Sequence, residues 1–70
     1  MERQAVKSGN IKSIGYERTS KTLEIEFHSG GLYEYAEVPE SVHEGLMKAE
    51  SHGSYFHQHI RHKYRFRKVR

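Results

Sequence analysis

Apolar and polar residues alternate along the first half of the chain, which is typical of half-buried strands. The alternation is clearest where Leu23, Ile25 and Phe27 are separated by glutamates. The pattern predicts three strands, over residues 11–16, 22–28 and 32–38. Residues 29–31, Ser-Gly-Gly, predict a hairpin turn between the last two strands, because glycine adopts positive φ without strain.

The spacing of apolar residues becomes helical after Pro39. Val42, Leu46 and Ala49 follow at i, i+4 and i+7, which places them on one face of a helix. Proline is favoured in the first turn of a helix, so we expect this helix to begin beside Pro39. Gly53 is the expected C-terminal stop, in the left-handed conformation that glycine allows.

A second, shorter helix is predicted over residues 55–61, with Ser54 as its N-cap. Phe56 and Ile60 lie four residues apart and share a face of this helix. Residues 64–67 alternate again and predict either a final strand or an extended arm.

These elements predict an α+β fold, in which two helices pack on one face of a three-stranded antiparallel meander. The helices must cover the apolar face of the sheet, because no other segment of the chain can. The C-terminal residues add a short strand or an arm. Residues 1–9 lack periodicity and are expected to be a flexible leader, so that a single domain spans residues 10–70.

The length of the turn after Phe27 decides where Tyr33 and Tyr35 point. A three-residue loop pairs Phe27 with Tyr33 and directs both tyrosines into the core. A two-residue loop places them beside Glu24 and Glu26 on the outer face, where they could stack bases. That second register would bury Glu34, and burying an unpaired carboxylate costs several kcal/mol. The first register is therefore favoured.

The composition limits the class of protein. Seventy residues, of which 34% are hydrophobic and 30% charged, suit one small globular domain. No apolar run exceeds two residues, which excludes a membrane-spanning helix and a signal-peptide core. We therefore expect a cytoplasmic protein without membrane contact. The absence of cysteine excludes disulfides and thiolate metal sites.

Charge is divided unevenly along the chain. Residues 1–50 carry six Lys or Arg against nine Glu, whereas residues 51–70 carry six Lys or Arg and no acidic residue. An acidic body with a basic end suggests an anionic partner, although a solvated tail that aids solubility gives the same pattern.

This basic end is the best candidate for nucleic-acid contacts, because its cations alternate with aromatic rings. The cations would contact phosphates, while Tyr64 and Phe66 would either stack on an unpaired base or anchor the end to the core. No segment is typical of a helix that reads the major groove, so we expect single-stranded or structured RNA, bound mainly through its backbone. The predicted contact residues are Arg61, Lys63, Tyr64, Arg65, Arg67, Lys68 and Arg70.

A protein-interaction module is the alternative function. Its partner would be an acidic protein or a second copy of the chain. An exposed edge strand, over residues 11–16 or 32–38, could pair with that partner. Concentration-dependent mass without nucleic-acid affinity would favour this class.

Histidines are also concentrated in the basic end, at His52, His57, His59 and His62. Residues two apart on a helix point in nearly opposite directions, so His57 and His59 cannot share a metal ion from one helix. Protonation of these histidines below about pH 6 would strengthen anion binding. We expect no metal, no cofactor and no enzymatic activity, since the chain has neither aspartate nor cysteine to build a nucleophilic triad.

The order of short motifs along the chain resembles that of a known family. The motifs are Ile14-Gly15-Tyr16, Leu23-Glu24-Ile25-Glu26-Phe27, Tyr33-Glu34-Tyr35, Val38-Pro39, Ser51-His52-Gly53-Ser54-Tyr55-Phe56 and Ile60-Arg61. Together they resemble the KTSC family, a small domain found at the C-terminus of some lysyl-tRNA synthetases and as a lone bacterial protein. The chain departs from the family at His57, where members often carry asparagine.

The resemblance covers nearly the whole chain and implies an RNA-related role through the synthetase attachment, which is association rather than mechanism. The family's marker is a Tyr-x-Tyr pair, here Tyr33 and Tyr35. The residues expected to form the core or the family motif are Tyr16, Phe27, Tyr33, Tyr35, Val38, Pro39, Phe56 and Ile60.

Overall fold

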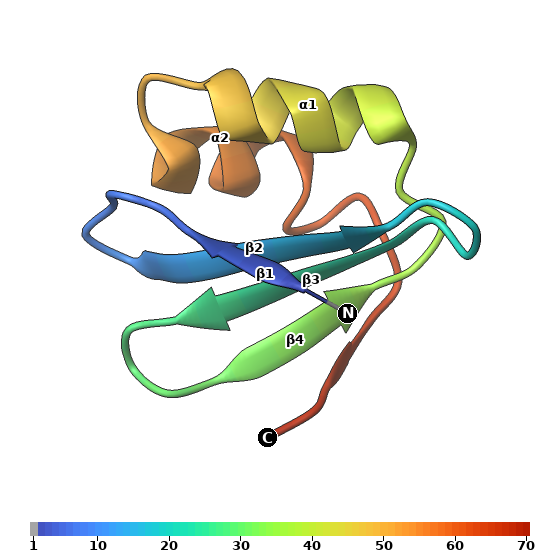
Figure 1. Cartoon of the computed structure of the whole chain (residues 1–70), viewed down its shortest axis with the longest axis horizontal. Coiled ribbons are helices and arrows are strands. Elements are labelled where there is room, and N and C mark those ends of the chain that lie inside the picture. The colour runs from blue at the N-terminus through green and yellow to red at the C-terminus, as the bar shows by residue number, and fades with distance from the viewer. Residues whose placement is uncertain (1) are drawn as a thin grey trace.

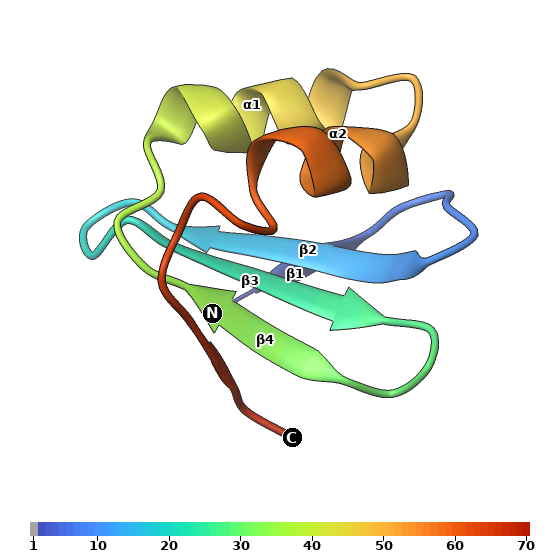
Figure 2. The same ribbon diagram turned by 180° about the vertical axis from the view of Figure 1, so that it is seen from behind.

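The computed structural model describes residues 2–70 and has two layers, an antiparallel sheet and a pair of helices on one of its faces (Figure 1). The sheet has the simple order β1-β2-β3-β4-β5. The view from behind shows both helices above the same face, with the C-terminal segment running beside β4 (Figure 2). The elements are β1 Arg3–Ala5, β2 Ile11–Glu17, β3 Thr22–Phe27, β4 Leu32–Tyr35, α1 Glu40–Lys48, α2 His52–His59 and β5 Phe66–Lys68.

The α+β class and the two helices are confirmed, but the strand count was wrong. Within residues 2–70 the sheet has five strands, because a short strand adds to each edge of the predicted meander. β1 lies in the segment predicted to be a leader, where Arg3 pairs with Gly15 of β2. β5 pairs with β4 at the other edge and is the final strand that the alternation of residues 64–67 left open beside an extended arm. Edge strands can be held by backbone bonds alone, so neither needs the apolar alternation that marks a central strand.

The turn between β3 and β4 has the predicted three-residue length but lies one residue earlier than expected. Phe27 N–H donates to the Gly31 carbonyl at 2.9 Å, so the loop consists of residues 28–30, with Gly30 at φ 107°. Tyr33 therefore pairs with Ile25 instead of Phe27. This is a shift of two residues, which preserves the face, and the tyrosines stay on the helix side as expected.

The core lies between the helices and the inner face of the sheet. Its fully or almost fully buried members come from every central element and are Ile11, Ile14, Leu23, Ile25, Tyr35, Val38, Leu46, Phe56 and Ile60. Ile11 reaches this core because the register between β2 and β3 shifts next to Lys12. Without that bulge, strict alternation would direct Ile11 to the same face as Ser13, away from the helices.

The helix boundaries differ from the predicted ones. Ser51, not Ser54, is the N-cap of α2, and its Oγ accepts a hydrogen bond from Ser54 N–H at 3.2 Å. Gly53 consequently lies in the first turn of α2 and does not terminate α1. α1 ends because Ala49 is already extended, at φ −66° and ψ 142°. Ser51 satisfies one of the free donors at the helix start, which explains the earlier beginning of α2.

The connection between the sheet and α1 also differs slightly from the prediction. β4 ends at Tyr35, because Glu37 adopts a positive φ of 55° that no regular strand accommodates. Pro39 then occupies the N-cap of α1, and Val38 is fully buried beneath the helices. The Tyr16 hydroxyl donates to the Val38 carbonyl, which ties this connection to β2. Within residues 2–70, neither helix is long and apolar enough to cross a membrane.

Candidate nucleic-acid interface

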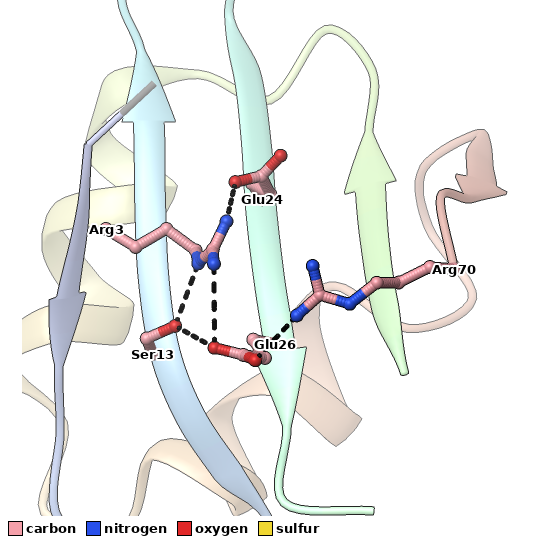
Figure 3. A network of polar contacts seen from close by, with 5 residues as sticks. All are labelled: Arg3, Ser13, Glu24, Glu26 and Arg70. Atoms are coloured by element: carbon pink, nitrogen blue, oxygen red, sulfur yellow. Dashed lines mark hydrogen bonds and ion pairs between the residues drawn. The ribbon is translucent and has the colours of Figure 1, made fainter. Parts of the chain in front are cut away.

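The outer face of the sheet, opposite the helices, carries acidic side chains that are neutralised by arginines. Arg3 reaches from β1 across β2, and its Nη1 lies 2.7 Å from Oε1 of Glu24 (Figure 3). Its Nε donates to the Ser13 hydroxyl at 3.0 Å, and its Nη2 lies 3.7 Å from Oε1 of Glu26. This network explains how Glu24 is buried without an unpaired charge.

Glu26 is the centre of the network. It accepts a hydrogen bond from Ser13 Oγ at 2.9 Å, and Arg70 Nη2 lies 2.9 Å from its other oxygen (Figure 3). The pKa of Glu26 is lowered, first by the hydrogen bond from Ser13, against an opposing desolvation, and further by nearby cations, Arg3 among them. Glu26 is thus held in its charged form.

Two of the predicted phosphate contacts belong to this outer face. Arg67 donates to Oε1 of Glu34 through both Nε, at 3.2 Å, and Nη2, at 2.9 Å. Arg70 is paired with Glu26 as described above. Their guanidinium groups are therefore already engaged by carboxylates, and the surface around them is acidic.

The other predicted cations lie elsewhere. Within residues 2–70, Arg61, Lys63, Arg65 and Lys68 are exposed and have no carboxylate within 4.0 Å. Lys68 pairs with Tyr33 across the β4–β5 ladder, on the same side of the sheet as Phe66. Alternation along β5 therefore separates Lys68 from Arg67, which lies on the acidic face.

An open cleft of about 690 Å³ lies between α2 and the inner face of β3, β4 and β5. We call it the aromatic cleft, because a cluster of five rings lines it. Each ring has a neighbour with centroids between 5.5 and 5.9 Å apart. The rings are those of Phe27, Tyr33, Tyr35, Phe56 and Phe66.

Exposure differs strongly among these rings. Tyr35 is only 4% exposed, and burial raises its pKa to about 12, with Tyr33 adding to the rise and Arg61 opposing it. Phe66 is 54% exposed although its ring lies 5.9 Å from Tyr33 and 5.7 Å from Tyr35. The cleft therefore offers a free aromatic surface above a buried aromatic floor.

The edge of the cleft is basic. Arg61 Nη1 lies 3.3 Å from His57 Nδ1, and the rings of His57 and His62 are 6.4 Å apart. We call these three residues the basic rim. His28 also lines the cleft, but its Nε2 is bonded to the Ser8 carbonyl at 3.0 Å. Within the described chain, no carboxylate lines the cleft.

The remaining histidines have structural partners. His52 Nδ1 lies 2.8 Å from the Leu46 carbonyl, His59 contacts Tyr55, and His43 stacks on Tyr16 with ring centroids 4.7 Å apart. Burial lowers the pKa of His43. Across residues 2–70, no three His or Glu side chains are close enough to hold one metal ion.

Some members of the candidate interface were not predicted from the sequence. His57 and His62 were expected to strengthen anion binding when protonated but not to line a cleft, and Tyr33 and Tyr35 were favoured as core, whereas all four line the cleft. Tyr64, predicted to contact nucleic acid or to anchor the chain end, packs against the core and is half-buried. No local sequence pattern predicts that α2 lies over β4, because the two elements are neighbours only in the folded chain.

Comparison with known proteins gives a consistent result. Residues 7–64 match the family model of the KTSC domain. An uncharacterized protein of Stutzerimonas stutzeri is 43% identical over 58 residues, which are 83% of this chain and 82% of that protein. A crystal structure of a KTSC domain protein from Yersinia pestis superposes with a TM-score of 0.96 at 42% identity, covering 99% of this chain and 97% of the other.

A longer relative is also similar over most of this chain. The lysine–tRNA ligase of Trichormus variabilis is 46% identical over 59 residues, which are 84% of this chain but only 10% of the ligase. The chain therefore corresponds to a small part of that enzyme. The match to the family model, which covers more than half of the chain, and the close structural relative show that this protein belongs to the KTSC domain family.

Proposed function

We propose that this domain binds single-stranded RNA, weakly and mainly through the backbone, on the side of the molecule that carries the aromatic cleft. The observation that supports this most directly is a cleft lined by the exposed ring of Phe66, by Arg61 and by histidines, with no carboxylate among its lining residues within the described chain. The occurrence of a similar segment in a protein named lysine–tRNA ligase is compatible with an RNA-related role. The proposed activity is binding without catalysis.

The cations proposed to contact phosphates are those without a carboxylate partner. Arg61, Lys63, Arg65 and Lys68 are all exposed and lie in the last ten residues of the chain. Arg67 and Arg70 are proposed as secondary contacts, because a phosphate would have to compete with Glu34 and Glu26. Tyr64, which packs on the core, positions this segment and is not a stacking residue in the proposal.

The shape of the interface favours a single strand over a duplex. Aromatic rings can stack only on bases that are not already stacked in a helix, and Phe66 provides such a ring. α2 is a short helix, His52–His59, and Phe56 on one of its faces is buried against the sheet. It therefore does not project from the domain as a helix that reads the major groove does.

Edge-strand pairing with another protein is less well supported. The strands expected at the edges, over residues 11–16 and 32–38, are instead covered by β1 and β5. These two edge strands are only three residues long, and they carry Arg3, Arg67 and Lys68. Short, charged edges discourage the addition of a further strand. RNA binding is therefore the function that the described surface favours.

Fluorescence anisotropy with a short labelled RNA, and with DNA of the same sequence, tests the proposal. Four contacts to a single strand give a log–log salt slope of about −3, which is about a fiftyfold loss of affinity between 50 and 200 mM salt. We expect binding that prefers RNA and remains measurable at the higher salt concentration. No binding at the lower salt concentration would refute the proposal.

A matched pair of variants locates the interface. Replacement of Lys63, Arg65 and Lys68 by Ala should reduce the magnitude of the salt slope by about 2. The control replaces Lys7, Lys12 and Lys48 by Ala, which removes the same charge from exposed positions that do not line the cleft. If both triple variants change the slope equally, binding follows net charge, and the proposed interface is wrong.

A further inference from the structure

We infer that the aromatic cleft is a nucleotide subsite, in which one base lies against Phe66 and its phosphate is held by Arg61, His57 and His62. The inference rests on the proposed function and adds to it a specific place and a chemical class of ligand. That class is an unstacked base joined to a phosphate, present in a single-stranded RNA and in a free mononucleotide.

The surface for the base is the exposed side of Phe66. Phe66 is 54% exposed, whereas Phe56 and Tyr35 are buried and Phe27 and Tyr33 are partly buried. The ring is not loose, because β5 pairs Phe66 with Tyr35 and its ring also contacts Tyr33. One side of Phe66 is thus fixed against the floor of the cleft, and the other can receive a planar ligand.

The surface for the phosphate is the basic rim. An arginine side chain can only donate hydrogen bonds, so His57 Nδ1 is the acceptor in its contact with Arg61 Nη1 at 3.3 Å. In the neutral ring the proton must then be on Nε2, which leaves His57 with a free donor. The other N–H groups of Arg61 and the ring of His62, 6.4 Å from that of His57, complete a set of donors suited to an anion.

The size and charge of the cleft fit a ligand of this class. About 690 Å³ lies within the range of cavities that enclose small organic ligands. An apolar aromatic ligand alone would leave the rim unused, and an inorganic anion alone would leave Phe66 unused. Within residues 2–70, no carboxylate among the lining residues opposes a phosphate. Only a ligand with both parts uses the whole cleft.

The experiment is a proton NMR titration of the wild-type protein with adenosine 5′-monophosphate, adenosine and inorganic phosphate, each up to about 10 mM. We expect the monophosphate to shift the ring signals of Phe66 and of His57 and His62 together, and to bind more tightly than adenosine or phosphate. Shifts confined to the histidines and equal for the monophosphate and phosphate would mean an adventitious ion only. That result, or no shift at all, would overturn the inference.

Two variants test the two halves of the subsite. Phe66→Leu keeps an apolar side chain in β5 but removes the ring. It should lower the affinity for adenosine 5′-monophosphate by about fivefold or more. Its control is Val69→Ala, which alters the other exposed large hydrophobic residue of the same segment, outside the cleft. Arg61→Gln should lower the affinity for the monophosphate by about threefold to tenfold, whereas its control, Lys48→Gln, should leave that affinity unchanged. Equal effects of a variant and its control would contradict the subsite.

The outcomes separate this inference from the proposed function. If RNA binds with the expected salt slope but the mononucleotide does not bind, the subsite is wrong and RNA binding stands. If a short RNA binds no more tightly than the mononucleotide, the subsite stands and a free nucleotide replaces RNA as the ligand. Tighter binding of the RNA, weakened by the same Phe66→Leu change, supports both.

Discussion

Arg70 and Glu26 are 44 positions apart in the chain, yet Arg70 Nη2 donates to Oε2 of Glu26 at 2.9 Å. Arg67 makes the equivalent contact with Glu34 on the neighbouring strand. The basic end and the acidic body of the sequence therefore meet on the outer face of the sheet. Two of the six cations of this end form intramolecular ion pairs, which reduces the positive charge available to an external partner.

The first prediction concerns the attachment of β5. We expect Arg67→Ala combined with Arg70→Ala to loosen this edge strand, because both side chains tie it to glutamates of β3 and β4. The Val69 amide, which donates to the Leu32 carbonyl at 2.7 Å, should exchange its hydrogen several times faster. Amide hydrogen exchange measured by NMR checks this.

The same variant also tests the assignment of these arginines to the outer face. Because their charges are already paired, their loss should reduce the magnitude of the RNA salt slope by less than the loss of Lys63 and Lys68 does. Arg18→Ala, which breaks the ion pair with Glu40 on another surface, is the control. An unchanged Val69 exchange rate would show that the backbone bonds alone hold β5.

The second prediction concerns pH and Glu26. Its pKa is lowered in the folded protein, with the hydrogen bond from Ser13 as the largest cause. A carboxylate whose pKa is lowered by folding stabilises the folded protein at pH values above its ordinary pKa of 4.5. This contribution is lost as the pH falls through the pKa of the folded state. We expect Ser13→Ala to raise the pKa of Glu26 and to flatten the decline of thermal stability in acid.

A titration of the Glu26 side-chain carbon by NMR, with melting curves between about pH 6 and 3, measures both effects. Ser41→Ala is a matched control, because Ser41 is exposed on α1, away from Glu26. Identical acid curves for the wild type and Ser13→Ala would contradict the assigned role of the hydrogen bond.

The central elements of the fold could be predicted because burial imposes a period on their sequences. Leu23, Ile25 and Phe27 must alternate with polar residues, since one face of β3 is covered by helices and the other is polar. β1 could not be predicted in this way, whereas the alternation over residues 64–67 left open either a final strand or an extended arm, and β5 is that strand, over Phe66–Lys68. Both edge strands are held by backbone pairing, which needs no apolar side chains, and Arg3 of β1 pairs with Glu24 and Glu26 of β3, far from it in the sequence.

The predicted boundaries of α2 and of the β3–β4 turn were wrong where two neighbouring residues of the same type suit the same position. Ser51 and Ser54 both suit an N-cap, and Gly30 and Gly31 both suit a turn. Which serine caps α2 and which glycine takes positive φ depend on the packing of the whole sheet and helix layer. The pair Tyr33 and Tyr35 kept the expected face, because a shift of two residues does not change the side of a strand.

The candidate interface was only partly visible in the sequence. The basic, aromatic composition of the chain end could be read directly, but not the division of its charges between two faces. Alternation separates Arg67 from Lys68 only once β5 is known to pair with β4. The contribution of His57 and Tyr33 to one cleft requires α2 to lie over β4, which no local pattern encodes.

The third prediction concerns the contact between the two helices. A Cβ added at Gly45 in α1 would overlap the hydroxyl of Tyr55 in α2 and lie 2.7 Å from its Cζ. Overpacking of this kind costs about 1–3 kcal/mol, and the gain of about 1 kcal/mol that alanine brings to a helix offsets only the lower end of that cost. We expect Gly45→Ala to destabilise the protein in urea denaturation.

A double-mutant cycle isolates the cause. In a Tyr55→Ala background the overlap is gone, so Gly45→Ala should be stabilising by about 1 kcal/mol through helix propensity alone. The change of sign between the two backgrounds is the expected signature. Stabilisation by Gly45→Ala in the wild-type background would show that Tyr55 moves aside without cost.

The fourth prediction concerns Tyr35 in the floor of the aromatic cleft. Burial raises its pKa to about 12 from an ordinary value of 10.0, and the Arg61 charge limits the rise. The neutral phenol therefore stabilises the fold below pH 10, and this contribution disappears as the pH rises towards 12. We expect Arg61→Gln to raise the pKa of Tyr35 further, whereas Lys48→Gln should leave it unchanged.

NMR observation of the Tyr35 ring carbon bonded to the hydroxyl measures this pKa without interference from the other four tyrosines. The measurement also tests the geometry of the cleft, since Arg61 can influence Tyr35 only if its charge lies close to the phenol. Ionisation of Tyr35 at pH 10 would mean that water reaches the hydroxyl freely and that the floor of the cleft is open. A pKa near 12 that does not respond to Arg61→Gln would instead place the basic rim too far from Tyr35 to act on a ligand resting on Phe66.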